Sequence, residues 1–274
     1  MRKLFVWLLA AGLLSACATS PTGRSQFMLI SPESAIVESE KAYINTVKQL
    51  DSQDKLADDP LLADRVARIT GRLVSVAVAE YPRTADWQWS VAIIDDPKTI
   101  NAWCMAGGRM AVYTGLFEKL DLTDDEFAHI MGHEIAHALA NHTAERMSRA
   151  MATNIGIVSV AILTDSNLAG LGAAAAATLA LELPNSRTAE SEADELGMQL
   201  AVRAGYSPDA AVTLWQKMGA EGGDGPPQFL STHPAPGNRE AALAEMAPRA
   251  RQLNPTGTRA AVHPVRIETG DTAG

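Results

Sequence analysis

The chain has 274 residues, of which 47% are hydrophobic and 20% charged, a composition typical of globular proteins and not of disordered or fibrous ones. Acidic residues outnumber basic ones 32 to 23, which gives a net charge of -9. Because binding to phosphate groups needs a basic surface, this balance excludes nucleic acid as a partner. Two cysteines are too few for a disulfide scaffold.

Residues 1–16 have the pattern of a lipoprotein signal peptide. Two basic residues precede an apolar run at residues 4–14, which suits a signal peptide but is too short to span a bilayer. The sequence Leu14-Ser15-Ala16-Cys17 resembles the lipobox of bacterial lipoproteins, so we expect Cys17 to become the lipid-modified N-terminus. An ordinary secretory signal cut elsewhere is the alternative. Ala18 in the next position is typical of lipoproteins sorted to the outer membrane, so the body of the protein should face the periplasm.

After the signal peptide, the patterns predict a lipidated polar tether at residues 17–25, a mostly helical α+β domain with one small sheet at 26–250, and a flexible tail at 251–274. In chain order, we expect a short strand at 26–30, helices at 32–50 and 60–80, strands within 87–113 broken by a loop at 107–108, a long helix at 124–148, and helices at 186–204 and from 207 onward. The long helix begins with a capping box formed by Thr123 and Glu126.

The long helix carries the most informative motif, His133-Glu134-Ile135-Ala136-His137. A spacing of four residues places both imidazoles on one face of a helix, where they can bind a single zinc ion. Glu134 stands beside the first ligand, where it can take a proton from the attacking water.

A catalytic zinc site needs a third protein ligand and one open position. His142 is a poor candidate, since it lies five residues beyond His137 and well round the helix. Glu190 and Asp194 share one face of the next polar helix, so Glu190 can bind zinc while Asp194 holds the second nitrogen of a ligand histidine. We expect Glu192 to point the other way, into solvent, and one zinc ion to bind per chain.

Several stretches resemble the HtpX/BepA-type zinc metallopeptidases of metallopeptidase family 48, whose third zinc ligand is a glutamate. They are residues 101–109, 113–116, 132–137, 187–197 and 232–234 with Arg239, and they extend over nearly all of residues 26–248. The short lipoprotein members are the most similar. Ala106 departs from the family, which usually has proline before the glycine pair, but it does not touch the metal motif.

The resemblance implies a zinc metalloendopeptidase that hydrolyses unfolded or damaged cell-envelope proteins, with the outer-membrane assembly machinery as a candidate partner. We expect substrate to pair as an added strand along Arg109-Met110-Ala111-Val112-Tyr113. The alternative is a chaperone-like or assembly lipoprotein that keeps the zinc fold with little or no turnover. Glu134 favours the enzyme, because a structural zinc site needs no such carboxylate.

His233 is predicted to lie close to the zinc, and both His233 and Arg239, which lie in one stretch of the resemblance, are candidates for gating the site or stabilising an oxyanion. As an oxyanion donor His233 would assist turnover, and as a resting fourth ligand it would close the open position. We favour the second role, and a histidine that merely caps the helix leading to Arg239 is the third alternative. The apolar segment 151–183 is expected beside the cleft, either as a mobile lid or as a static helical pair.

Overall fold

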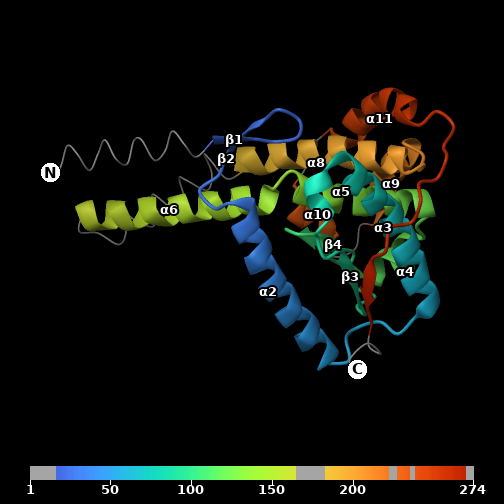
Figure 1. Ribbon diagram of the computed structural model, residues 1–274, viewed down its shortest axis with the longest axis horizontal. Coiled ribbons are helices and arrows are strands. Elements are labelled where there is room, and N and C mark those ends of the chain that lie inside the picture. Colours follow the sequence, from blue (N-terminus) through green and yellow to red (C-terminus); the bar gives the residue numbers. More distant parts are fainter. Residues whose placement is uncertain (1–16, 165–182, 222–226, 235–237, 270–274) are drawn as a thin grey trace.

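The computed structural model describes residues 17–164, 183–221, 227–234 and 238–269. It is a mostly helical α+β domain with one small mixed sheet, as the sequence predicts (Figure 1). The strands are β1 (Cys17–Thr19), β2 (Ser25–Phe27), β3 (Ser90–Ile94), β4 (Ala102–Met105), β5 (Arg109–Tyr113) and β6 (Arg266–Glu268). The helices are α2 (Pro32–Asp51), α3 (Pro60–Glu80), α4 (Gly115–Leu120), α5 (Asp124–Leu139), α6 (His142–Thr164), α8 (Leu183–Arg203), α9 (Asp209–Ala220), α10 (Gln228–Thr232) and α11 (Arg239–Ala250), with short 3-10 turns at Pro82–Thr84 and Arg251–Leu253.

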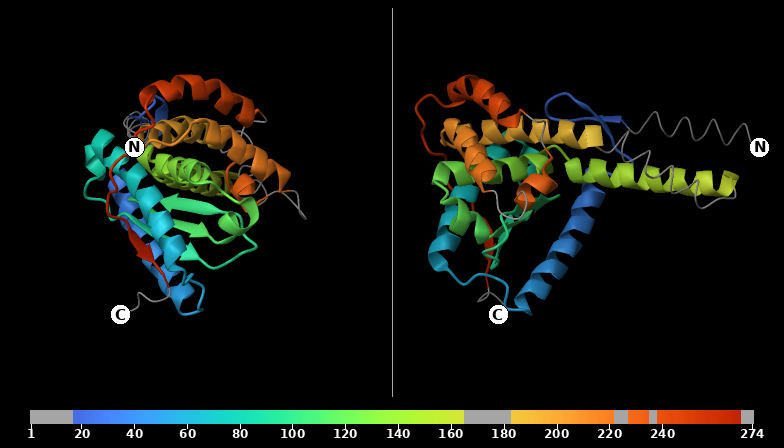
Figure 2. Two further views of the ribbon diagram at one scale, coloured as in Figure 1. Left: turned by 90° about the vertical axis from the view of Figure 1, so that its right-hand side faces the viewer. Right: turned by 180° about the vertical axis from the view of Figure 1, so that it is seen from behind.

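The central sheet has the strand order β4-β5-β3-β6. Strand β3 is parallel to both β5 and β6, whereas β4 and β5 form an antiparallel pair. Alternate residues of a strand face opposite sides, and here Val91 and Ile93 join the core built on α3 and α5, while Ala92 and Ile94 pack with Tyr43 of α2. The sheet therefore has helices on both faces (Figure 2), and helix α5 on one of them contains His133 and His137.

The expected single helix at 124–148 is two helices, and this part of the prediction is wrong. Helix α5 starts at the predicted capping box of Thr123 and Glu126 but ends at Leu139, and α6 begins at His142. Between them Asn141 adopts a positive φ of 55°. Asparagine tolerates this left-handed conformation better than most residues, so it ends the helix in the way that glycine commonly does.

Helix α6 contains the first part of the apolar segment 151–183. Figures 1 and 2 show α6 projecting away from the rest of the domain. Residues 165–182 lie outside the described part of the chain, so the expectation of a lid or of a static pair concerns residues that the structure does not describe. In the described residues, none of the helices combines the length and the hydropathy that a bilayer crossing requires.

The first and last described segments of the chain each contain a strand pairing that the sequence does not predict. The expected tether contains a hairpin in which β1 pairs with β2, Cys17 opposite Phe27. The expected flexible tail contains β6, which pairs with β3 and places Ile267 opposite Val91. A strand of three residues has too weak a pattern to be recognised alone, since its stability comes from the partner strand.

Candidate metal centre

Helix α5 places His133, Glu134 and His137 in the interior of the protein, and all three side chains are buried. Its backbone lies very close to α8, because Gly132 and Gly197 face each other with no side chain between them. A Cβ atom at Gly197 would lie 2.7 Å from the backbone nitrogen of His133. The two glycines thus let the helices approach closely enough for α8 to supply a ligand to the histidines of α5.

Glu190 of α8 lies between the two histidines of the motif. Its two carboxylate oxygens are 3.2 Å from Nε2 of His133 and 3.4 Å from Nε2 of His137, and these two nitrogens are 3.0 Å apart. The prediction that Glu190 lies in one cluster with His133 and His137 is therefore confirmed.

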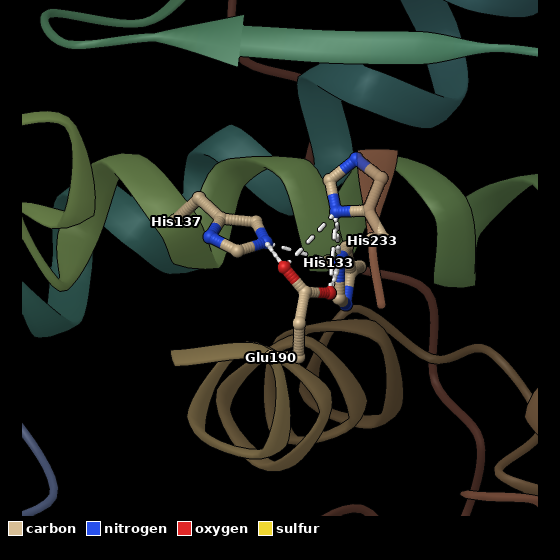
Figure 3. A group of neighbouring side chains, drawn as sticks. All are labelled: His133, His137, Glu190 and His233. Atoms are coloured by element: carbon tan, nitrogen blue, oxygen red, sulfur yellow. Dashed lines mark hydrogen bonds and ion pairs between the residues drawn. The ribbon is translucent and has the colours of Figure 1, made fainter. Parts of the chain in front are cut away.

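His233, at the C-terminal end of α10, completes the cluster. Its Nδ1 lies 3.2 Å from Glu190 and 3.2 Å from Nε2 of His133 (Figure 3). One ligand atom from each of the four residues lies within 4.8 Å of the other three. His233 is therefore close to the metal ligands, as predicted. Its ring stacks on that of Phe229, with the two ring centroids 4.5 Å apart.

The donor set fits zinc. In a tetrahedral site with zinc–nitrogen distances of about 2.0–2.1 Å, neighbouring ligand atoms lie about 3.3 Å apart. The separations of 3.0–3.4 Å among His133, His137 and Glu190 agree with this value. Imidazole nitrogens and carboxylate oxygens that converge on one point are also the arrangement that a cation stabilises.

The electrostatics of the cluster agree with metal binding. Burial raises the pKa of Glu190, but hydrogen bonds from His133 and His233 outweigh it and hold that pKa well below its usual value. Burial lowers the pKa of His133, while hydrogen bonds to Asp194 and Glu190 raise it to about 9. Burial raises the pKa of Glu134, which suits a group that must first accept a proton and then return it.

Asp194, the predicted partner of a ligand histidine, contacts His133. Its Oδ1 is 3.0 Å from Nδ1 of His133, so it can hold this imidazole with Nε2 directed at the ligand cluster. Arg239 bonds to Asp194, lies 3.6 Å from Glu190, and stacks over the ring of Trp215 at 3.8 Å. Arg239 therefore fixes the carboxylates behind the cluster, and these contacts do not place it where an oxyanion would form.

A cleft of about 460 Å³ opens beside the cluster. Its lining includes Glu134, His137, Glu190 and His233 on one side and residues Asn101–Cys104 on the other. One oxygen of Glu134 has no hydrogen-bond partner among the described residues. The cleft therefore brings a candidate general base, the ligand cluster and a strand together.

The strand beside the cleft is β4, and the prediction of β5 as the substrate strand is wrong. Strand β5 lies between β4 and β3 and is hydrogen-bonded on both edges, so Arg109, Met110, Ala111, Val112 and Tyr113 have no free edge to offer. In the described residues, β4 pairs with β5 on one edge and with no strand on the other. Hydrophobic alternation identified both segments as strands but could not reveal their order in the sheet.

Glu192 and His142 also differ from the prediction. Glu192 is buried, not solvated, and it contacts Nε2 of His142 at 3.1 Å. His142 is not a member of the ligand cluster, as predicted, but its Nδ1 lies 2.8 Å from Nδ1 of His137. The weak signal for this contact in the sequence is a third histidine five residues after the motif.

A buried motif of two histidines and a glutamate on one helix, with a glutamate ligand from a second helix and an open cleft, defines a zinc metallopeptidase of the glutamate-ligand class. The model of "Peptidase family M48" matches residues 60–247. The chain therefore belongs to peptidase family M48.

Curated relatives fall into two groups. Bovine mitochondrial metalloendopeptidase OMA1 is 31% identical over 274 residues, which cover 93% of this chain and 51% of the relative. The Arabidopsis thaliana OMA1 is 34% identical over 188 residues, 69% of this chain and 38% of the relative. The beta-barrel assembly-enhancing protease of Escherichia coli K12 is 30% identical over 219 residues, 76% of this chain and 43% of the relative. The chain thus spans about half or less of the length of these relatives.

Proposed function

We propose that this metalloendopeptidase uses one zinc ion to cleave extended segments of unfolded or damaged cell-envelope proteins, from a lipid anchor at Cys17 that holds it at the outer membrane facing the periplasm. The observation that carries the choice of substrate is the edge of β4 that pairs with no other described strand and lies along the cleft that contains Glu134 and the ligand cluster. An unpaired strand edge binds extended backbone with little selection among side chains.

His133, His137 and Glu190 would hold the metal, with Asp194 and Arg239 fixing the ligands from behind. The chemistry that zinc supplies in such a site is polarisation of the peptide carbonyl and a lower pKa for the attacking water. Glu134 accepts the proton of that water and delivers it to the leaving amine.

The bound peptide would extend the sheet along β4. Its backbone would pair with the edge of residues Ala102–Met105, which places a scissile bond across the cleft from Glu134. The N–H of Cys104 already donates to Glu134, so the base is fixed to the same strand that would receive the substrate. Burial also raises the pKa of the Cys104 thiol, which keeps it neutral beside this carboxylate.

Catalytic turnover can be separated from metal binding with two variants. Glu134→Gln should retain zinc by elemental analysis and lose casein cleavage by about a hundredfold or more. Glu190→Ala should lose both zinc and cleavage, whereas Glu195→Ala, an exposed carboxylate on the same helix, should retain both. Full cleavage by Glu134→Gln would contradict the proposed base, and absence of any chelator-sensitive cleavage by the wild type would favour the chaperone-like alternative.

The anchor follows from the lipobox pattern at residues 14–17. Metabolic labelling with a fatty-acid analogue should mark the wild type, which should fractionate with outer membranes. Cys17→Ser should lose both the label and the membrane association. A label that persists on the serine variant would contradict an anchor at this position.

A further inference from the structure

A continuous chain of polar contacts joins the N-terminal hairpin to the metal ligand His137. Nδ1 of His137 lies 2.8 Å from Nδ1 of His142, and Nε2 of His142 lies 3.1 Å from Glu192. Glu192 in turn accepts hydrogen bonds from Arg24 at 2.8 Å and from Thr22 at 2.6 Å. Thr22 and Arg24 belong to the hairpin of β1 and β2, which lies over the junction of α6 and α8 (Figure 1).

The order of the contacts fixes where each proton lies. His137 directs Nε2 at the ligand cluster, so the nitrogen that carries its proton is Nδ1. Nδ1 of His142 must then accept, which leaves the proton of His142 on Nε2, facing Glu192. Glu192 accepts from all its partners and needs no proton of its own. These proton positions are all consistent with His137 as a neutral ligand.

Arg24 is the cation that this arrangement requires. Its guanidinium lies between two buried carboxylates, with Glu192 at 2.8 Å and Glu145 at 2.7 Å. Removing Arg24 would leave Glu145 paired with Arg149 at 2.7 Å, but Glu192 would keep no arginine or lysine contact among the described residues, and a buried carboxylate without such a partner is costly unless it moves. A displaced Glu192 would no longer be the fixed acceptor that orients His142.

We propose that the N-terminal hairpin, residues 17–27, is a positioning element of the metal centre, in which Arg24 holds Glu192, Glu192 holds His142, and His142 orients the zinc ligand His137. The hairpin lies outside residues 60–247, the part that matches the family model. Asp194 contacts and orients His133 directly, so the two histidines of the motif are oriented by different parts of the molecule.

The proposal rests on zinc binding at the centre, and its test measures zinc affinity in competition with a chelator, together with the visible spectrum of the cobalt-substituted protein. Arg24→Met should weaken zinc affinity by about tenfold or more, the range found when partners of metal ligands are removed, and should alter the cobalt spectrum. Gln26→Met is the matched control. Gln26 docks the same hairpin by donating to the carbonyl of Ala140 at 2.7 Å and to Glu145 at 2.9 Å, and it does not contact Glu192, so its loss should lower thermal stability and leave affinity and spectrum unchanged.

A double variant separates positioning from general stability. In a His142→Phe background, Arg24→Met should cause no further loss of zinc affinity, because Arg24 acts on the metal ligand only through His142. If Arg24→Met does not fold, Thr22→Val removes only the hydroxyl donor to Glu192 and should weaken zinc affinity in the same direction.

Wild-type zinc affinity and cobalt spectrum in folded Arg24→Met, or additive losses in the double variant, would overturn the proposal. A loss of zinc affinity in Gln26→Met equal to that in Arg24→Met would also overturn the proposal, since the hairpin would then only stabilise the fold in general. Failure of the wild type to bind zinc would instead contradict the metal centre itself.

Discussion

The carboxylate of Glu134 is buried and only partly satisfied. The backbone N–H of Cys104 donates to it, while its Oε1 has no hydrogen-bond partner among the described residues and lies 3.4 Å from Nε2 of His233. A buried acceptor without a donor costs free energy and usually has a functional reason. Here the free oxygen faces the cleft, where a water molecule can donate to it and be positioned for attack.

Zinc binding should release a proton from His133 at pH 7. The neighbouring carboxylates raise the pKa of His133 to about 9, so this group carries a proton at pH 7 before the metal binds, and a ligand imidazole must be neutral. Zinc affinity should therefore rise with pH up to about 9 and level off above it. Calorimetric titrations at pH 7 in two buffers of different ionisation enthalpy would measure the proton. Asp194→Asn should release less, and a wild type that releases none would contradict the assignment.

His233 should restrain the resting enzyme. Its Nδ1 lies among the ligand atoms, 3.2 Å from both Glu190 and His133, where it competes for the position that water and substrate need. His233→Ala should therefore keep zinc and cleave casein faster than the wild type. A fall in kcat of about a hundredfold would instead assign His233 as an oxyanion donor. Unchanged kcat, KM and zinc content would leave it as a helix-end residue.

At the scale of elements, the packing of α5 on α8 decides the geometry of the centre. The backbones meet at Gly132 and Gly197, one residue from the ligand His133 and three residues from Asp194. Because interiors are close-packed, any side chain added there must push the helices apart. The distance between the ligands of the two helices is therefore set by two glycines.

Gly197→Ala should lower both stability and zinc affinity. Its Cβ would lie 2.7–2.8 Å from backbone atoms of His133, and neither helix can yield without moving a ligand. Gly219→Ala is the matched control on α9. Nothing lies within 4 Å of a Cβ there, and alanine should stabilise the helix by about 0.5–1 kcal/mol with zinc affinity unchanged. Thermal denaturation with a chelator competition assay measures both. Equal behaviour of the two variants would contradict the role of the close contact.

The local parts of the site were predictable from the sequence, because four-residue spacing on a helix fixes relative positions. His133 with His137, and Glu190 with Asp194, follow from that rule. The burial of Glu192 does not follow from that rule. The sequence predicts that its face of α8 meets solvent, and the hairpin that buries Glu192 comes from residues far away in the chain. Asn141 carried a usable signal, because asparagine commonly ends a helix.

At the scale of the whole molecule, the order of strands could not be predicted. Alternation identified Val91, Ile93 and the segment Arg109–Tyr113 as strand residues, but it carries no information about neighbours. The structure puts β5 inside the sheet and leaves β4 at the edge beside the cleft. Long-range pairings of β3 with β5 and β6 decide this order, and the second partner comes from a segment whose composition indicates a loose tail.

Strand β6 also has a consequence for solubility. It covers one edge of β3, whose residues Ser90–Ile94 are entirely buried and mostly apolar. An exposed, apolar strand edge is a template for aggregation, and the residues that cover this one are the last described part of the chain. While the C-terminal segment is unpaired, during synthesis or after partial unfolding, copies of the protein can associate through β3. Arg266→Pro, which removes the N–H that donates to the carbonyl of Trp89 at 3.1 Å, should therefore aggregate with rising concentration in light scattering, whereas Arg266→Lys should remain monodisperse. An Arg266→Pro protein as soluble as the wild type would show that the edge needs no cover. The same segment that looks dispensable in sequence would thus keep copies of this protein from joining one another at the edge of β3.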